Sequence, residues 1–237
     1  MEVHRFSYRW SGQSSIYTGD RMDSSSSFLD LYDFRLRVSA MYRERNQALD
    51  GGADPAATHA RFVASRDRLF ARHPHSALTP EQRAAFTGLD YFPYNSAMCV
   101  EGVMDSGVQP ERREVATSGE EAMPMERVGT VRFDLGRRDY ALTLYWIDVY
   151  GGGLFLPFVD ATAPDETYGG GRYLIDTVKG SDFRILERSL DGWRVELDFN
   201  YGYNPSCAYD YRWVCPLAPA ENRLPVRIEA GEKKFTA

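Results

Sequence analysis

The hydrophobic pattern of the sequence changes its period near Gly88. Between Asp30 and Leu49 the apolar residues recur at near-helical spacing, which predicts an amphipathic helix. Asp54-Pro55 and Thr79-Pro80 each place a capping residue before a proline, so two further helices are predicted to start there. After Gly88 the period shortens towards two, as in strands. Helices followed by strands are typical of an α+β fold.

The second part of the sequence predicts an antiparallel sheet. Residues 111–117 and 125–134 form a predicted hairpin closed by residues 118–121, and Asp191-Gly192 indicates another. Residues 140–149 are largely apolar on both faces, which places their strand inside the sheet. Further strands are predicted over residues 98–104, 154–159, 172–177, 183–188, 193–200 and 225–230. We therefore expect a mainly antiparallel, strongly bent sheet, a β-barrel or a sandwich, with helices from the N-terminal third packed against it.

The first thirty residues differ from the rest. Residues 4–10 alternate like a short strand, and a loop ending in four serines follows them. We predict an N-terminal extension over residues 1–29 and a single α+β domain over residues 30–237, helical over 30–88 and β-rich over 98–237.

The charge of the chain narrows the classes of partner. The formal net charge is −6, whereas nucleic-acid binding and docking on anionic membranes need a basic surface. No apolar run approaches the roughly 20 residues of a membrane span, and residues 1–5 lack the apolar core of a secretory signal. We expect a cytoplasmic protein whose partner is a small molecule, with no nucleic-acid and no membrane partner. Whether it forms a homodimer stays open.

A series of characteristic segments runs from about residue 60 onwards. It includes Tyr168-Gly169-Gly170-Gly171-Arg172 and Tyr203-Asn204-Pro205-Ser206-Cys207, within residues 73–76, 86–92, 154–160, 166–174, 197–200, 203–209, 215–217, 221–224 and 228–232. With these segments the chain resembles the bacterial family known only as domain of unknown function 1684. The resemblance implies a shared fold and a region between Tyr168 and Glu232 where functional residues concentrate. It implies no activity.

Asp198 and Asn200 are two positions apart in a predicted strand, so their side chains share one face. Leu197 and Phe199 occupy the other face. If the sheet closes, Asp198 could act as a general base in a polar cavity, and Asn200 could orient a substrate carbonyl. The alternative is a solvent-exposed face with the core behind it.

Arg172 is the third candidate catalytic residue. It follows three glycines at the start of a predicted strand, and its planar guanidinium group suits a carboxylate or a phosphate. The alternative is a structural ion pair with Asp198, Asp160 or Asp176.

The surrounding aromatic and polar residues are candidates for substrate binding. They are Tyr168, Tyr173, Tyr203, Asn204, Tyr209 and Glu232. Tyrosine most often serves as an amphipathic packing residue, with an apolar ring and a polar hydroxyl group. Several tyrosines beside polar residues also suit the wall of a pocket. Glu232 could be an exposed carboxylate or a partner for Arg172.

The sequence leaves several roles open for Cys207 and Cys215. Zinc would need more ligands than these two thiols, and a disulfide is disfavoured in a reducing cytoplasm. A catalytic Cys207 would need a nearby base, which the local sequence does not offer. We therefore expect two buried packing thiols, and neither a metal nor a cofactor.

Two functional hypotheses follow from these residues. The leading one is a cofactor-independent enzyme of the hydrolase, lyase or cyclase type. It would act on a small polar or polyfunctional organic molecule by acid–base chemistry, with Arg172, Asp198 and Asn200 in one polar cluster walled by tyrosines. The rival is a non-catalytic domain that binds a small ligand or serves as a scaffold through a buried polar network.

Overall fold

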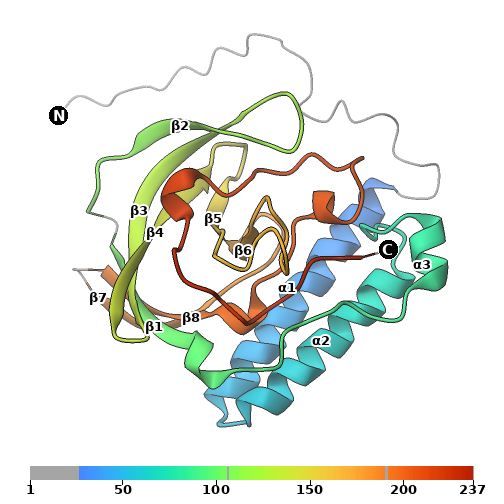
Figure 1. Cartoon of the computed structure of the whole chain (residues 1–237), viewed down its shortest axis with the longest axis horizontal. Helices are drawn as coiled ribbons and strands as arrows, with labels where there is room; N and C mark the ends of the chain where they lie inside the picture. Colours follow the sequence, from blue (N-terminus) through green and yellow to red (C-terminus); the bar gives the residue numbers. More distant parts are fainter. Residues whose placement is uncertain (1–26, 106, 190–191, 237) are drawn as a thin grey trace.

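A computed structural model describes residues 27–105, 107–189 and 192–236 (Figure 1). Three helices precede one curled antiparallel sheet, so the α+β fold is confirmed. The strand predicted over residues 4–10 and most of the serine-rich loop lie outside the described residues.

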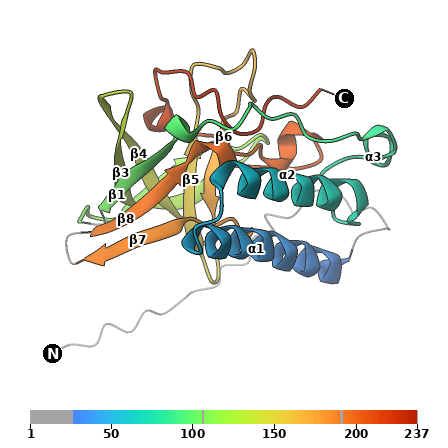
Figure 2. The same ribbon diagram turned by 90° about the horizontal axis from the view of Figure 1, so that it is seen from below.

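Local signals place the three helices where they were predicted. They are α1 (Phe28–Asp50), α2 (Pro55–Arg72) and α3 (Pro80–Ala85). The Asp54 side chain accepts from the backbone amide of Ala57 and caps α2. Thr79 and Gln82 form a reciprocal capping box at the start of α3, as their spacing predicts. α1 and α2 lie side by side (Figure 2). None of the described helices has the length and apolar character needed to cross a membrane.

The sheet is a strongly curled half-barrel. Its strands are β1 (Cys99–Asp105), β2 (Glu111–Val115), β3 (Met123–Leu135), β4 (Arg138–Ile147), β5 (Gly153–Phe158), β6 (Arg172–Asp176), β7 (Arg184–Ser189) and β8 (Gly192–Asp198). Their order is β6-β5-β4-β3-β1-β8-β7, and β2 pairs with β3. The sheet curls around the loops that follow β8, and α1 and α2 lie on its open side (Figure 1). β4 lies between β3 and β5, which confirms its interior position.

The main hydrophobic core is formed by the sheet and the loops that pack against it. Its members come from every described strand except β2 and β7, and from the loops beyond. They include Val131, Leu142, Leu156, Phe158, Ile175, Val195, Leu197, Phe199 and Ile228, all nearly without solvent exposure. A second cluster, on α1 and α2, contains Val38, Tyr42, Phe62 and Leu69 with Tyr201. Tyr201 thus joins the helices to the end of the sheet.

One predicted strand is absent and another ends earlier than predicted. Residues 225–230 are not a strand, because their backbone groups bond side chains: Ile228 N–H donates to Asp160 at 2.7 Å and Ile228 O accepts from Arg172 at 3.1 Å. The strand predicted over residues 193–200 stops at Asp198, whose side chain accepts from the amide of Asn200 and caps a short 3-10 turn.

Candidate functional site

The structure divides the predicted site residues among separate groups. Arg172 and Asp198 share no hydrogen-bond partner in the described part of the chain, so the expected single cluster is not formed. Asp198 and Asn200 are in contact with each other. Tyr203, Asn204, Tyr209 and Glu232 gather elsewhere, around an arginine of α2.

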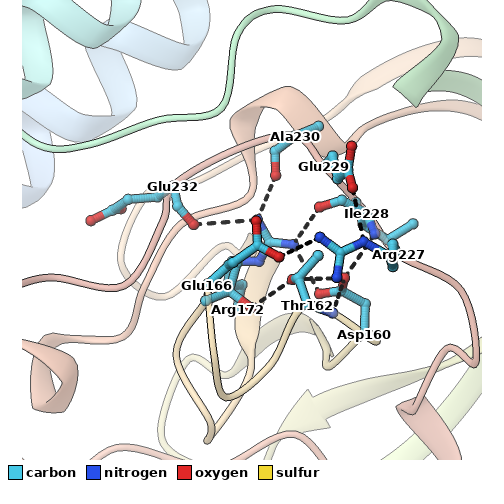
Figure 3. A network of polar contacts seen from close by, with 10 residues as sticks. Asp160, Thr162, Glu166, Arg172, Arg227, Ile228, Glu229, Ala230 and Glu232 are labelled. Atoms are coloured by element: carbon cyan, nitrogen blue, oxygen red, sulfur yellow. Dashed lines mark hydrogen bonds and ion pairs between the residues drawn. The ribbon is translucent and has the colours of Figure 1, made fainter.

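Arg172 is the centre of a buried network (Figure 3). Its Nη2 atom donates to Asp160 Oδ1 at 3.0 Å and to Ile228 O at 3.1 Å, and Nη1 donates to the main-chain oxygens of Ala230 and Glu232. The side chain of Glu232 points away from Arg172 (Figure 3). Burial lowers the pKa of the Arg172 guanidinium, and the Asp160 carboxylate opposes this shift. Of the partners considered from the sequence, Asp160 is the one that Arg172 engages.

Asp160 supports the same network from its other oxygen. Its Oδ2 accepts from Ile228 N–H at 2.7 Å and from the amide and hydroxyl groups of Thr162 at 3.1 and 2.8 Å. A second arginine, Arg227, links the same parts of the chain from the exposed side, through Glu166 (Figure 3). The buried network therefore holds residues 228–232 against the start of β6. The Nη1 and Nη2 donors of Arg172 are committed to the protein itself, whereas its buried Nε atom has no hydrogen-bond partner among the described residues.

Asp198 lies at the last position of β8, opposite Cys99 at the first position of β1. Asn200 N–H and Nδ2–H both donate to Asp198 Oδ1, at 2.9 and 2.7 Å. The Asn200 amide is in turn fixed by the main chain of Asn95, with both bonds at 2.9 Å. His59 Nε2 lies 2.9 Å from the Asn200 carbonyl oxygen, and since a carbonyl only accepts, this ring nitrogen donates. The Asp198 carboxyl group is thus held in one orientation.

Acidic and weakly acidic groups surround Asp198. Burial raises the pKa of the Asp198 carboxyl, and the neighbouring Glu196 carboxylate raises it further. Burial also raises the pKa of the Cys99 thiol, and raises that of Tyr94 to about 12. Cys99, Glu196 and Tyr94 are partly exposed, so solvent reaches this group. Arg184 pairs with Glu196 at 2.6 Å.

The same group offers donor atoms for a cation. One ligand atom from each of Cys99, Glu196 and Asp198 lies within 4.8 Å of the others. A thiolate with two carboxylates is a donor set that zinc accepts. The sequence could not predict this set, because it depends on the register of β1 against β8.

A third group surrounds Glu232. Its carboxylate accepts from Arg66 Nη2 and from the backbone N–H of Asn204, both at 3.1 Å, and from the Tyr209 hydroxyl. The Arg66 guanidinium lies over the ring of Tyr203, 5.0 Å from its centre. Arg66 and Glu232 are buried, so the carboxylate pairs with Arg66 rather than with Arg172 or solvent.

Arg66 was missed in the sequence, although a signal exists. It lies four residues after Phe62 and four before Phe70, on the buried face of α2. An arginine at a core position of an amphipathic helix indicates a buried partner.

Three buried polar atoms of this third group have no hydrogen-bond partner among the described residues: Arg66 Nε, Tyr91 Oη and Asn204 Oδ1. Tyr91 belongs to the group because its backbone bridges to Glu232. Burial raises the pKa of the Tyr91 phenol, and the Arg66 charge opposes this. Unpaired polar atoms are rare in native interiors, so these three make the group a candidate for binding a small polar molecule.

The remaining tyrosines have different surroundings. Tyr173 is fully buried in β6, donates to the Pro216 carbonyl and packs edge-on against Phe155 with ring centres 4.7 Å apart. Tyr168 Oη lies 3.5 Å from Cys207 Sγ. Tyr173 is therefore core packing, and Tyr168 belongs to the neighbourhood of the cysteines.

Two hollows of the described surface lie on the helices rather than at these groups. One, of about 630 Å³, is lined by residues of α1, α2 and the segment after α2, which include Asp33, Arg37 and His73. The other, of about 250 Å³, includes Arg45 and Arg68. Neither hollow contains a predicted site residue, and both have charged linings.

Comparison with known proteins gives a family and a fold relative. A family model described as "Protein of unknown function (DUF1684)" matches residues 84–233. The solution NMR structure of an uncharacterised protein from gene locus rrnAC0354 of Haloarcula marismortui is similar, with a TM-score of 0.55 and 32% sequence identity over 75% of this chain and 92% of that one. Among proteins with curated descriptions, none matches. The matched residues include Asp198 and Glu232 but not Arg66.

Proposed function

Because the chain belongs to the DUF1684 family of proteins of unknown function, we propose its function from its own geometry: an enzyme that acts on a small polar organic molecule by acid–base chemistry at Asp198. The reaction would be of the hydrolase, lyase or cyclase type and would need no cofactor. One observation carries this proposal. The Asp198 carboxyl group is desolvated, oriented by Asn200 through a single oxygen, and bordered by partly exposed groups.

The raised pKa of Asp198 supports the role of an acid or base. A carboxyl group transfers protons most effectively when its pKa approaches the working pH, and burial moves the pKa of Asp198 in that direction. Because Asn200 occupies Oδ1, the transferred proton would move to or from Oδ2. The substrate would reach it past Cys99 and Tyr94.

Asn200 and Arg172 take supporting roles in this proposal. The side chain of Asn200 is engaged by Asn95 and Asp198, so Asn200 is a positioning residue rather than a substrate contact. Arg172 orders residues 228–232, and we assign it no contact with the substrate.

The test compares wild-type protein with Asp198→Asn, in which the side chain keeps an acceptor for Asn200. Each protein is incubated with a pool of small polar metabolites, and consumption is followed by mass spectrometry. Glu101→Gln is the matched control, because Glu101 is a carboxylate on the neighbouring strand that is exposed and paired with Arg194. We expect a metabolite that wild type and the control consume, and that Asp198→Asn consumes about 10²–10⁴-fold more slowly.

Two results would count against the enzyme. One is unchanged turnover by folded Asp198→Asn. The other is a pool in which wild type consumes nothing.

The second candidate is a non-catalytic protein that binds a small polar molecule beside Arg66 and Glu232. It is favoured by the unpaired Arg66 Nε, Tyr91 Oη and Asn204 Oδ1 atoms, which together offer donors and acceptors. A ligand of this kind would raise the unfolding temperature of wild type, and the shift would shrink in Tyr91→Phe, which loses only the hydroxyl group. An equal shift in Tyr91→Phe would exclude this position.

A further inference from the structure

Cys207 and Cys215 face each other across a short loop. Cys207 lies in the 3-10 turn Ser206–Ala208, and its backbone N–H donates to Cys215 Sγ at 3.4 Å. Cys215 is buried, whereas Cys207 is partly exposed. Cys207 is therefore partly open to solvent, and the buried thiol of Cys215 lies within hydrogen-bonding distance of its backbone.

Each cysteine is held by backbone structure of its own. The Cys207 turn is closed by hydrogen bonds from Ala208 N–H to Pro205 O at 2.9 Å and from Tyr209 N–H to Ser206 O at 3.1 Å. Cys215 is paired with Ser118 on both sides: Ser118 N–H donates to Cys215 O at 2.8 Å, and Cys215 N–H donates to Ser118 Oγ at 3.0 Å. Backbone hydrogen bonds therefore fix the positions of both cysteines.

The surroundings differentiate the two thiols. The hydrogen bond with the Cys215 thiol lowers the pKa of Cys207 to about 6, with help from the Tyr168 and Ser118 hydroxyl groups against the effect of burial. The same contact and burial raise the pKa of Cys215. A thiolate at the accessible position is the nucleophilic form of cysteine.

The third cysteine of the chain has the opposite environment. Burial raises the pKa of the Cys99 thiol, and the carboxylates of Asp198 and Glu196 raise it further. Cys99 is also partly exposed. Its reactivity therefore shows what partial exposure alone allows, without a lowered thiol pKa. It is an internal control for any reaction at Cys207.

We propose that Cys207 and Cys215 are a redox-active pair that hydrogen peroxide converts into an intramolecular disulfide, with Cys207 as the attacking thiol and Cys215 as the resolving thiol. In the first step, Cys207 Sγ attacks one peroxide oxygen and the O–O bond breaks, which gives a sulfenic acid on Cys207 and releases water once the leaving hydroxide takes a proton. In the second step, Cys215 Sγ displaces the hydroxyl group from that sulfur. The S–S bond forms, and a second water leaves. The two thiols lose two electrons, and the peroxide gains them.

Reduction of the disulfide needs an external thiol. Two molecules of a low-molecular-weight thiol return the pair to its reduced form and leave as their own disulfide. The site is independent of Asp198 and of the proposed enzymatic reaction.

The first experiment uses reduced full-length wild type and needs no substitution. A limiting amount of isotope-coded iodoacetamide at pH 7 labels the three cysteines in competition, and peptide mass spectrometry reads the rates. We expect Cys207 to be alkylated at least about tenfold faster than Cys99, since its thiolate fraction is much higher. Equal rates, or faster labelling of Cys99, would overturn the assignment.

The second experiment treats wild type, Cys207→Ser, Cys215→Ser and Cys99→Ser with hydrogen peroxide. Wild type and Cys99→Ser should form a peptide that links residues 207 and 215. Folded Cys215→Ser should stop at a sulfenic acid on Cys207 that dimedone traps, and Cys207→Ser should give neither product. Wild type that stays fully reduced, or a trapped sulfenic acid on Cys215 instead of Cys207, would refute the proposed roles.

Discussion

Replacing Arg172 by methionine should destabilise the protein far more than any change at the neighbouring Arg227. Both arginines connect the segment around residue 228 to residues 160–166, but Arg172 is 1% exposed and the side chain of Arg227 is 48% exposed. Methionine fills much of the same space beside Phe158, although the guanidinium group that covers its ring at 4.9 Å is lost. The substitution therefore tests the polar contacts rather than the packing.

The expected size of the effect follows from the contacts that are lost. Arg172→Met leaves Asp160 without its cationic partner, and breaking a buried ion pair from one side costs about 3–5 kcal/mol. Asp160 keeps the hydrogen bonds from Ile228 and Thr162, which moderates this loss. Three main-chain carbonyls that accepted from Arg172 lose a donor, which adds to it at about 1 kcal/mol each. We expect a net loss of about 3–5 kcal/mol.

Urea unfolding followed by tryptophan fluorescence measures this loss, and thermal unfolding provides a second reading. At this chain length each kcal/mol shifts the unfolding temperature by about 2–4 °C, so a decrease of about 6–20 °C is expected. Arg227→Gln is the control and should leave the midpoint close to that of wild type, because exposed ion pairs contribute little. A loss below about 1 kcal/mol in Arg172→Met, compared with the 3–5 kcal/mol expected for a broken buried pair, would refute the reasoning. So would an equal effect of both substitutions.

Three further predictions test other parts of the structure. Asn222→Ala removes a buried side chain that hydrogen-bonds backbone groups of β4 and β5 at 2.7–2.9 Å, and urea unfolding should show a loss of about 3 kcal/mol or more. Gly231→Ala should destabilise strongly, since φ is +77° and a Cβ atom would lie 2.6 Å from the carbonyl oxygens of Gly202 and Phe199; a thermal midpoint equal to that of wild type would contradict this. Asp198→Asn should gain stability relative to wild type as the pH rises from about 4 towards 7. Because the pKa of Asp198 is raised in the folded state, its contribution to the stability of wild type is fully present below the unfolded-state pKa. That contribution is lost as the pH rises through the folded-state pKa. A difference that stays constant in urea unfolding across this range would contradict the sign.

The parts of the fold that were predicted correctly depend on neighbouring residues. The caps at Asp54 and Thr79 need only the next few positions, and the alternation of β4 depends on its own side chains. The end of β8 was missed by the same local reasoning. The Asp198 side chain bonds its own backbone two residues later, so a residue that alternates like a strand member in fact ends the strand.

The arrangement of the candidate sites could not be predicted from neighbouring residues in the sequence. Three aspartates competed as partners for Arg172, and the choice of Asp160 follows from the turn that brings it 3.0 Å from Nη2. Glu232 was expected to be exposed or paired with Arg172, but α2 supplies Arg66 from far upstream. Cys99 joins Asp198 only through the register of two strands that are distant in sequence. Such partners are chosen by topology, which a single sequence does not display.

The buried ion pair between Arg66 and Glu232 has a consequence for the order of folding. The two residues are 166 positions apart, so during synthesis α2 emerges from the ribosome long before its partner carboxylate exists. Until then the guanidinium group of Arg66 must stay hydrated, because an unpaired buried charge is too costly. The helical hairpin therefore cannot dock completely on the sheet before residue 232 has been made. Contacts of such long range slow folding, and the final step of this fold should wait for one of its most distant residues.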